Sequence, residues 1–310
     1  MQPAAPLVAA IEAGGTKFVV AVGSGPDDIK TLTRVETTEP SRTLREVMQV
    51  IAAACRKYGP IQAIGVGSFG PIDLHPESAT YGYITTTPKP GWQHTALLAP
   101  LHSRFQVPLG FDTDVNAAAI GEMLWGAGQN LDPLVYITVG TGVGGGVIVG
   151  QQPLHGLLHP EIGHLMVPAP STPGVIVPEC YCPFHKSCLE GFVSGAAIAA
   201  RWGIRGEMMP ADHPAWEEVA ETLAYGLINI ILTLSPKRII MGGGVMKQVG
   251  LLESVRSHTV RLLNGYINAS AITQDIHSYI VAPGLGDRSG ICGALALGIN
   301  AMREAQGASQ

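Results

Sequence analysis

The stretch Leu7–Gly23 reads LVAAIEAGGTKFVVAVG, in which an apolar run is followed by Gly14 and Gly15 and then by a second apolar run. Two apolar runs joined by a short glycine turn predict a β-hairpin. The same order returns at Leu134–Gly150, LVYITVGTGVGGGVIVG, again as strand, glycine turn and strand. The sequence therefore predicts that one supersecondary unit occurs twice.

The segments after each hairpin repeat as well. An amphipathic helical pattern comes first and a buried apolar strand ending in glycines follows; these are Leu44–Lys57 with Ile61–Gly67, and Trp216–Leu234 with Arg238–Met241. This duplication predicts an α/β protein with two domains of mixed sheets flanked by helices and an interdomain cleft. Elsewhere the patterns predict a helix over Gly191–Trp202 and a strand over Gln274–Val281.

Domain boundaries follow from this duplication. We expect a first domain over residues 1–118, joined by a C-terminal helix over 291–310. The second domain is expected to span 119–290 and to carry a metal-binding insertion over 159–190.

Composition narrows the class of partner. The 310 residues are 46% apolar and only 14% charged, which indicates well-buried cores. A formal net charge of -5 without a run of Lys or Arg argues against nucleic acid and against a polybasic membrane patch, so small molecules are the expected partners. Neither a signal peptide nor a membrane-spanning run is recognisable, which predicts a cytoplasmic protein without disulfides.

A cluster of metal-binding residue types lies between residues 159 and 191. HPEIGH at 159–164 is followed by CYCPFHKSCLEG at 180–191, which together offer thiolates and imidazoles at His164, Cys180, Cys182, His185 and Cys188. Spacings of two or three residues suit a closed tetrahedral zinc site, which uses four ligands and leaves one spare. The alternative is a set of thiols with incidental histidines. Zinc bound here would draw Glu161 and Glu190 towards one pocket wall.

Glycine-rich turns are the second set of candidates. Gly14, Gly15, Thr16 and Lys17 offer backbone amides, a hydroxyl and an ammonium group, which suit a phosphate, although a plain hairpin turn explains them too. Five glycines within Gly140–Gly146 favour a phosphate loop over a bulged hairpin packed on a neighbouring backbone. Gly140, Thr141 and Gly142 begin this stretch, and a third loop at Gly242, Gly243 and Gly244 follows a buried strand.

A carboxylate suited to proton transfer occurs in the stretch DTDVN, residues 112–116. The stretch lies at a predicted strand-to-helix junction, where Asp114 could accept a proton from a nucleophile. Helix capping by Thr113 or Asp114 competes with that interpretation. Among the histidines outside the cluster, we expect His75, His94, His155 and His159 to be loop or surface residues.

Taken in order, several stretches resemble the ROK family of sugar kinases: Glu12–Lys17, Asp112–Glu122, Gly140–Gly146, His159–His164 and the cysteine cluster. Thr87–Trp92 and CPFHKSC resemble its bacterial fructokinase branch. The resemblance implies two actin-like, ribonuclease-H-like domains and ATP-dependent phosphorylation of a hexose at C6, with Mg²⁺ accompanying ATP. Fructose is the leading sugar, with mannose or glucose as alternatives. A homodimer is also implied.

The resemblance also implies residue roles. Asp114 falls on the catalytic base, the two glycine hairpins on the phosphate loops and the third loop near the adenosine. Thr113, Glu161, His164 and Glu190 fall on sugar-pocket positions, and His164 joins Cys182, His185 and Cys188 around a structural Zn²⁺, with Cys180 spare.

Three positions depart from the family pattern. Glu12 replaces an Asp, Thr113 replaces a sugar-binding Asn of glucokinase-like members, and His185 replaces a cysteine. Sugar-responsive regulators of the family carry a helix-turn-helix before the first hairpin, where this sequence has about a dozen residues, so a regulator is disfavoured. A zinc-stabilised sugar-binding protein without catalysis is the other rival.

Overall fold

The structure, a computed structural model, describes residues 6–170 and 179–307. The chain divides into two compact units, each with its own hydrophobic core. Unit 1 contains the chain up to Gly126 together with residues 155–159 and the chain from Arg288 onward. Unit 2 contains residues 127–154 and 160–287.

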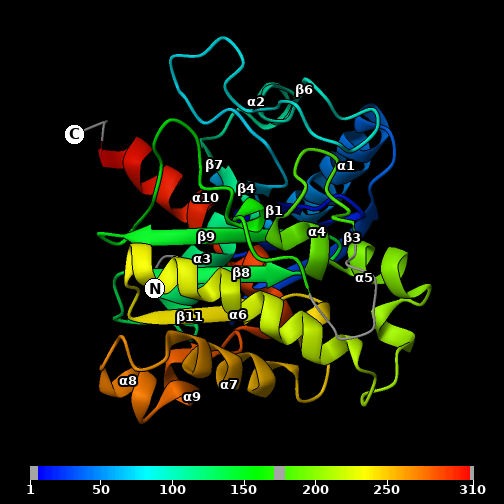
Figure 1. The fold of residues 1–310 in the computed structure, drawn as a ribbon. Coiled ribbons are helices and arrows are strands. Elements are labelled where there is room, and N and C mark those ends of the chain that lie inside the picture. The colour runs from blue at the N-terminus through cyan, green and yellow to red at the C-terminus, as the bar shows by residue number, and fades with distance from the viewer. Residues whose placement is uncertain (1–5, 171–178, 308–310) are drawn as a thin grey trace. The chain divides into compact units, whose positions relative to one another are not determined.

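Unit 1 is built on a five-stranded sheet in the order β3-β2-β1-β4-β7 (Figure 1). Strands β1, β2 and β3 form an antiparallel meander, and β4 and β7 continue the sheet parallel to β1. The strands are β1 (Val8–Ala13), β2 (Lys17–Gly23), β3 (Ile29–Glu36), β4 (Ala63–Ser68) and β7 (Leu109–Thr113), with a separate pair β5 (Tyr83–Ile84) and β6 (Thr95–Ala96). The hairpin predicted around Gly14 is therefore present.

Unit 2 repeats this order in its own sheet, β10-β9-β8-β11-β12. Its strands are β8 (Leu134–Val139), β9 (Val143–Val149), β10 (Gln152–Pro153), β11 (Arg238–Gly242) and β12 (Ile280–Val281). Again three antiparallel strands are followed by two parallel ones. The prediction of an α/β fold in which one unit with a mixed sheet occurs twice is confirmed.

Helices pack on each sheet because their apolar faces need burial. Unit 1 carries α1 (Pro40–Tyr58), α2 (Leu98–Phe105), α3 (Asp114–Trp125) and α10 (Ser289–Gly307). Unit 2 carries α4 (Leu189–Val193), α5 (Gly195–Trp202), α6 (Ala215–Leu234), α7 (Leu251–Leu263), α8 (Ser270–Thr273) and α9 (Ile276–Tyr279). Short 3₁₀ turns η1 (Ile162–His164), η2 (Gly206–Met208), η3 (Val245–Lys247) and η4 (Gly286–Arg288) complete the list.

Close packing of small residues joins α10 to unit 1. A Cβ on Gly110 would collide with the Leu297 backbone of α10, and one on Gly121 of α3 would collide with the carbonyl of Ser289. Helix α3 therefore belongs with α10 through its whole length. The first domain was predicted to end at residue 118, inside α3, whereas the unit boundary lies after Gly126. The last three residues of the predicted 291–310 helix lie outside the described residues.

Two predictions about local structure were wrong. The single helix expected over 191–202 is two helices, because Ser194 is extended and its hydroxyl accepts a hydrogen bond from the Ala197 N–H at 3.1 Å, capping α5. The strand expected over 274–281 is mostly helix α9, and only Ile280 and Val281 join the sheet. Burial of Tyr279 next to Ile280 breaks the alternation that a strand would show.

Among the residues that the structure describes, no helix combines the length and the apolar character needed to cross a membrane.

Candidate active site and metal centre

Four side chains of unit 2 gather at one point in the cysteine-rich segment. Ligand atoms of His164, Cys182, His185 and Cys188 all lie within 4.8 Å of one another. The Sγ atom of Cys182 is 3.8 Å from Nδ1 of His164 and 3.4 Å from Nδ1 of His185, and Sγ of Cys188 is 3.6 Å from Nδ1 of His164. Zinc bond lengths place S and N ligands of a tetrahedron about 3.6 Å apart, so these donors fit a zinc ion.

Backbone pairing holds these ligands in place. Turn η1 carries His164, and the adjacent Leu165 carbonyl accepts a hydrogen bond from the Leu189 N–H at 2.9 Å. Cys188 is the N-cap residue of α4 and also bridges to Met166. The two halves of the predicted metal segment, 24 residues apart at His164 and Cys188, are therefore joined by protein contacts.

Cys180 lies beside this group without belonging to it. Its Sγ is 3.9 Å from Sγ of Cys188, and it packs against Gly191, where a Cβ would collide with the sulfur. Burial raises the pKa of the Cys188 thiol to about 12. A thiol in that setting stays protonated unless a cation displaces the proton. Zinc binding requires this displacement, because the ligand is the thiolate.

Helix α4 connects this cluster to the second glycine loop. Glu190, two residues after Cys188, accepts a hydrogen bond at Oε2 from the Val143 N–H at 2.9 Å. A Cβ on Gly142 would approach the same carboxylate oxygen to 2.7 Å, so a larger residue there would displace the end of the Glu190 side chain. The Ile162 side chain packs against Gly145, where a Cβ would collide with it. The alternative of a packed hairpin therefore explains part of the glycine content of this loop.

The second and third glycine loops are neighbours in unit 2. Gly243 adopts a φ of 97° and lies against the Val139 carbonyl, directly before the second loop. The Gly140 carbonyl accepts a hydrogen bond from the Gly195 N–H, the first residue of α5, at 2.7 Å. The structure therefore brings together Gly140–Gly142 and Gly242–Gly244, which are 100 residues apart in the sequence.

The first glycine loop belongs to unit 1 and is held by the neighbouring strand. The Gly14 N–H donates to the Lys17 carbonyl at 3.1 Å, and the Thr37 hydroxyl donates to the Gly14 carbonyl at 2.8 Å. Gly15, Thr16 and Lys17 are exposed. The backbone of the turn is thus held by hydrogen bonds at Gly14, while the three residues after it are exposed.

Glu161 occupies a more open position than Glu190. It is exposed and precedes η1, where its carbonyl accepts a hydrogen bond from the His164 N–H at 2.9 Å. Glu161 lies near the candidate ligand His164 because the two residues are close in the sequence. Glu190 is placed instead by its contact with the glycine loop.

Capping and catalysis compete at the start of α3, and the structure divides them between two residues. Thr113 is the N-cap, because its hydroxyl accepts a hydrogen bond from the Asn116 N–H at 3.0 Å. Asp114 is the first helical residue, and its carboxylate accepts a local hydrogen bond from the Val115 N–H at 2.9 Å. Desolvation raises the pKa of Asp114 to about 6.

Two of the histidines set aside in the sequence have defined partners in unit 1. His159 lies in a loop, as predicted, but is buried there, and its Nε2 lies 3.4 Å from the Ile72 N–H. His155 pairs with the buried carboxylate of Asp112 at 3.0 Å. Local patterns carry no signal for a pair separated by 43 residues, so neither His155 nor Asp112 was singled out.

The ROK family model matches residues 8–301 of this chain. The chain belongs to the ROK family. A putative fructokinase of Bacillus subtilis is 42% identical over 299 residues, covering 96% of this chain and 97% of that protein. A fructokinase of Zymomonas mobilis is 42% identical over 298 residues, covering 94% and 96%. A ROK glucokinase from Streptomyces griseus, solved with glucose and AMPPNP, has a TM-score of 0.74 at 25% identity, covering 95% and 99%.

ROK membership explains the duplicated sheet order, since the structural relatives share the actin-like pair of domains. It also confirms the resemblance based on the glycine hairpins and the HPEIGH stretch. Within this ROK chain, unit 1 supplies the first glycine loop and Asp114, and unit 2 supplies the metal cluster, Glu190 and the other two loops.

Proposed function

We propose that this ROK protein transfers the γ-phosphoryl group of ATP to fructose, producing fructose 6-phosphate and ADP. Asp114 carries the proposal, because its carboxylate is desolvated while the capping task belongs to Thr113. A pKa of about 6 keeps the group ionised near neutrality yet basic enough to accept a proton. Full-length similarity to fructokinases supports fructose as the acceptor.

In the proposed reaction, Asp114 accepts the proton of the attacking hydroxyl. The C6 hydroxyl of fructose loses its proton to the carboxylate while its oxygen forms a bond to the γ-phosphorus, and the bond from that phosphorus to the bridging oxygen of ADP breaks. Such phosphoryl transfer depends on positioning and charge neutralisation more than on covalent chemistry. A positioned base contributes roughly 10²–10⁴-fold. ATP enters as its Mg²⁺ complex, whose cation neutralises phosphate charge.

The glycine loops support a nucleotide site through positions where the fold does not require glycine. A Cβ on Gly15, Gly140 or Gly244 would meet no atom within 4 Å, and none of the three has a left-handed φ. A residue that neither packing nor backbone conformation restricts to glycine points to a ligand that approaches the main chain. We assign phosphates to Gly14–Lys17 and Gly140–Gly142, and the adenosine side to Gly242–Gly244.

The sugar is assigned to Thr113, Asp114, Glu161, His164 and Glu190. Carboxylates of Glu161 and Glu190 would accept hydrogen bonds from sugar hydroxyls, and Thr113 retains its hydroxyl hydrogen as a donor. This assignment rests on motif position in the family and on the exposure of Glu161.

A structural Zn²⁺ is part of the proposal, held by His164, Cys182, His185 and Cys188. Four protein ligands leave no open coordination position, so the ion would stabilise the segment and take no part in phosphoryl transfer. Bound zinc would hold the residues before α4, and with them Glu190, at the second glycine loop. A homodimer, which the family resemblance implies, is proposed with it.

The test is a coupled ADP-release assay with a panel of hexoses that includes fructose, mannose, glucose and N-acetylated sugars. We expect fructose to give the highest kcat/KM, and Asp114→Asn to lower kcat by roughly 10²–10⁴-fold without unfolding the protein. A higher kcat/KM for glucose or mannose would show that the substrate is that sugar and not fructose. Sugar binding without ADP release would show that the protein binds sugar but is not a kinase. Near-normal turnover of Asp114→Asn would exclude it as the base.

A further inference from the structure

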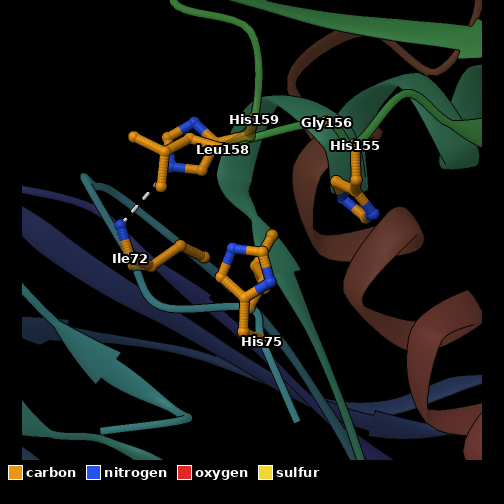
Figure 2. Close-up of a pocket in the computed structure, with 7 residues that line it drawn as sticks. Ile72, His75, His155, Gly156, Leu158 and His159 are labelled. Carbon is orange, nitrogen blue, oxygen red and sulfur yellow. Dashed lines mark hydrogen bonds between the residues drawn. The ribbon is translucent and has the colours of Figure 1, made fainter. Parts of the chain in front are cut away.

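Residues 155–159, here called the strap, belong to unit 1, although the residues before and after them belong to unit 2. Three imidazoles take part in the contacts of the strap, and that of His155 also lies 3.4 Å from Nδ2 of Asn116 and 3.3 Å from Oδ1 of Asp112. Nε2 of His155 lies 3.0 Å from Oδ2 of Asp112, Nε2 of His75 lies 3.0 Å from the Leu157 carbonyl, and Nε2 of His159 lies 3.4 Å from the Ile72 N–H. All three imidazoles line one pocket, and Figure 2 shows how they lie around it.

The His155 contact differs from the other two because it meets a buried carboxylate. Asp112 is 3% exposed. Its Oδ1 accepts hydrogen bonds from the Thr113 N–H and from Nδ2 of Asn116, both at 2.7 Å, and its Oδ2 faces His155. A buried carboxylate is costly without a partner, and the hydrogen bond to Asp112 raises the pKa of His155, which favours the charged imidazolium.

Asp112 in turn holds the first turn of α3. Its two donors, Thr113 and Asn116, are themselves joined, since the Thr113 hydroxyl accepts the Asn116 N–H. Asp114 is the first residue of that turn, between the two. The chain of contacts from His155 through Asp112 therefore ends on the backbone that carries Asp114.

We propose that His155 is a positioning residue, which holds Asp114 in its working orientation through the buried Asp112 carboxylate. This inference rests on the proposed role of Asp114 as the base. His155 touches neither of the reacting groups in this account. It holds the orientation of the Asp112 carboxylate, and Asp112 holds the helix turn through the hydrogen bonds that it accepts.

Loss of His155 is expected to lower kcat more than it raises the KM for ATP. The Asp112 carboxylate would lose its hydrogen-bonded imidazole partner and rotate towards water, so the first turn of α3 would shift. Misplacement of a catalytic group by about 1 Å costs up to about 10²-fold. We therefore expect His155→Ala to reduce kcat for fructose by roughly 10- to 100-fold, with the KM for ATP within about twofold of wild type.

The experiment combines three variants with one chemical rescue. His155→Ala is compared with His75→Ala, a matched control that removes another imidazole contact of the strap without touching Asp112. The third variant is Asp112→Asn, alone and combined with His155→Ala. Because the neutral amide needs no cation, removing His155 should cost little more in the Asp112→Asn background. His75→Ala should retain most of the wild-type kcat.

Free imidazole supplies a readout that a merely structural role would not change. The His155 side chain is 42% exposed and borders the open cavity, so added imidazole can reach the space that His155→Ala leaves. We expect imidazole to restore part of the lost kcat in this variant and to leave wild type and His75→Ala unchanged. If His155→Ala unfolds, His155→Gln, which keeps a neutral donor, should fold and show an intermediate kcat.

Several results would overturn the inference while leaving the proposed function intact. One is a wild-type kcat in His155→Ala, and another is a loss of kcat in His75→Ala as large as that in His155→Ala. A third is that His155→Ala lowers kcat by the same factor with Asp or with Asn at position 112. The fourth is that imidazole restores no kcat to His155→Ala. A wild-type protein inactive on every hexose would instead overturn the proposed function and this inference together.

Discussion

The Glu190 carboxylate accepts a hydrogen bond from the backbone N–H of Val143 at 2.9 Å. This contact joins Glu190, two residues after Cys188 of the candidate metal cluster, to the second glycine loop of the same unit. It also means that one loop amide is already occupied by a protein carboxylate. The metal segment and the glycine loop are thus parts of one local structure.

That contact predicts different effects for two substitutions of Glu190. Glu190→Gln keeps an oxygen that can accept from Val143, so the loop should hold its position and the defect should lie mainly in the KM for fructose. Glu190→Ala removes the acceptor and should also raise the KM for ATP by several-fold, a loss of about 1 kcal/mol. Steady-state kinetics with each substrate varied separately checks both expectations. An equal KM for ATP in the two variants would contradict the coupling.

Gly140→Ala tests the nucleotide assignment without a packing penalty. An added Cβ would meet no protein atom within 4 Å, so the melting temperature should change little, whereas the KM for ATP should rise if a phosphate lies against this backbone. Gly25→Ala is the matched control, because its Cβ would also meet nothing and it lies outside the three loops. If folded Gly140→Ala shows unchanged ATP kinetics, the assignment of an ATP phosphate to this loop is wrong.

The pKa of Asp114 predicts the acid limb of the rate profile. A base must be ionised, and a pKa raised by desolvation to about 6 means that kcat/KM for fructose falls about tenfold per pH unit below that value. The measurement is the ADP-release rate at low fructose between about pH 5 and pH 8. An acid limb near pH 4, the range of an ordinary Asp, would show that the carboxylate is solvated in the working enzyme.

The same shift predicts a stability gain for Asp114→Asn. Because the folded pKa lies above the unfolded value, the folded protein binds the proton more tightly, and Asp114 costs stability increasingly as the pH rises from about 4 to about 6. Asn carries no such cost. The variant should therefore unfold at higher denaturant above pH 7, by about 1–3 kcal/mol, and match wild type near pH 4. Equal stabilities at both pH values would contradict the desolvation.

Metal analysis of two cysteine variants tests the zinc site. Cys182→Ser removes a ligand of the four-residue cluster, so the purified protein should lose its zinc and melt at a lower temperature. Cys180→Ser is the matched control from the same segment and should retain one zinc per chain. Retention of zinc by Cys182→Ser together with its loss in Cys180→Ser would assign the fourth position to Cys180.

The duplicated fold was predictable because its signals are local. Apolar runs of strand length around glycine turns recur at Leu7–Gly23 and Leu134–Gly150, and each becomes an antiparallel hairpin in the same place of its sheet. Where tertiary packing decides, local patterns failed. Residues 274–281 were predicted to form a strand, whereas Ile276–Tyr279 forms a helix in which Tyr279 is buried.

For the candidate functional residues, the sequence by itself determined which chemical groups are present: the glycine loops, the candidate zinc ligands and the Asp114 carboxylate at a strand-to-helix junction. Only the tertiary structure decided which of them meet. It separated Cys180 from the four clustered donors, gave the cap to Thr113, and paired His155 with Asp112. The reason is physical: burial and pairing of charges depend on neighbours brought together by folding, and sequence spacing carries no record of them.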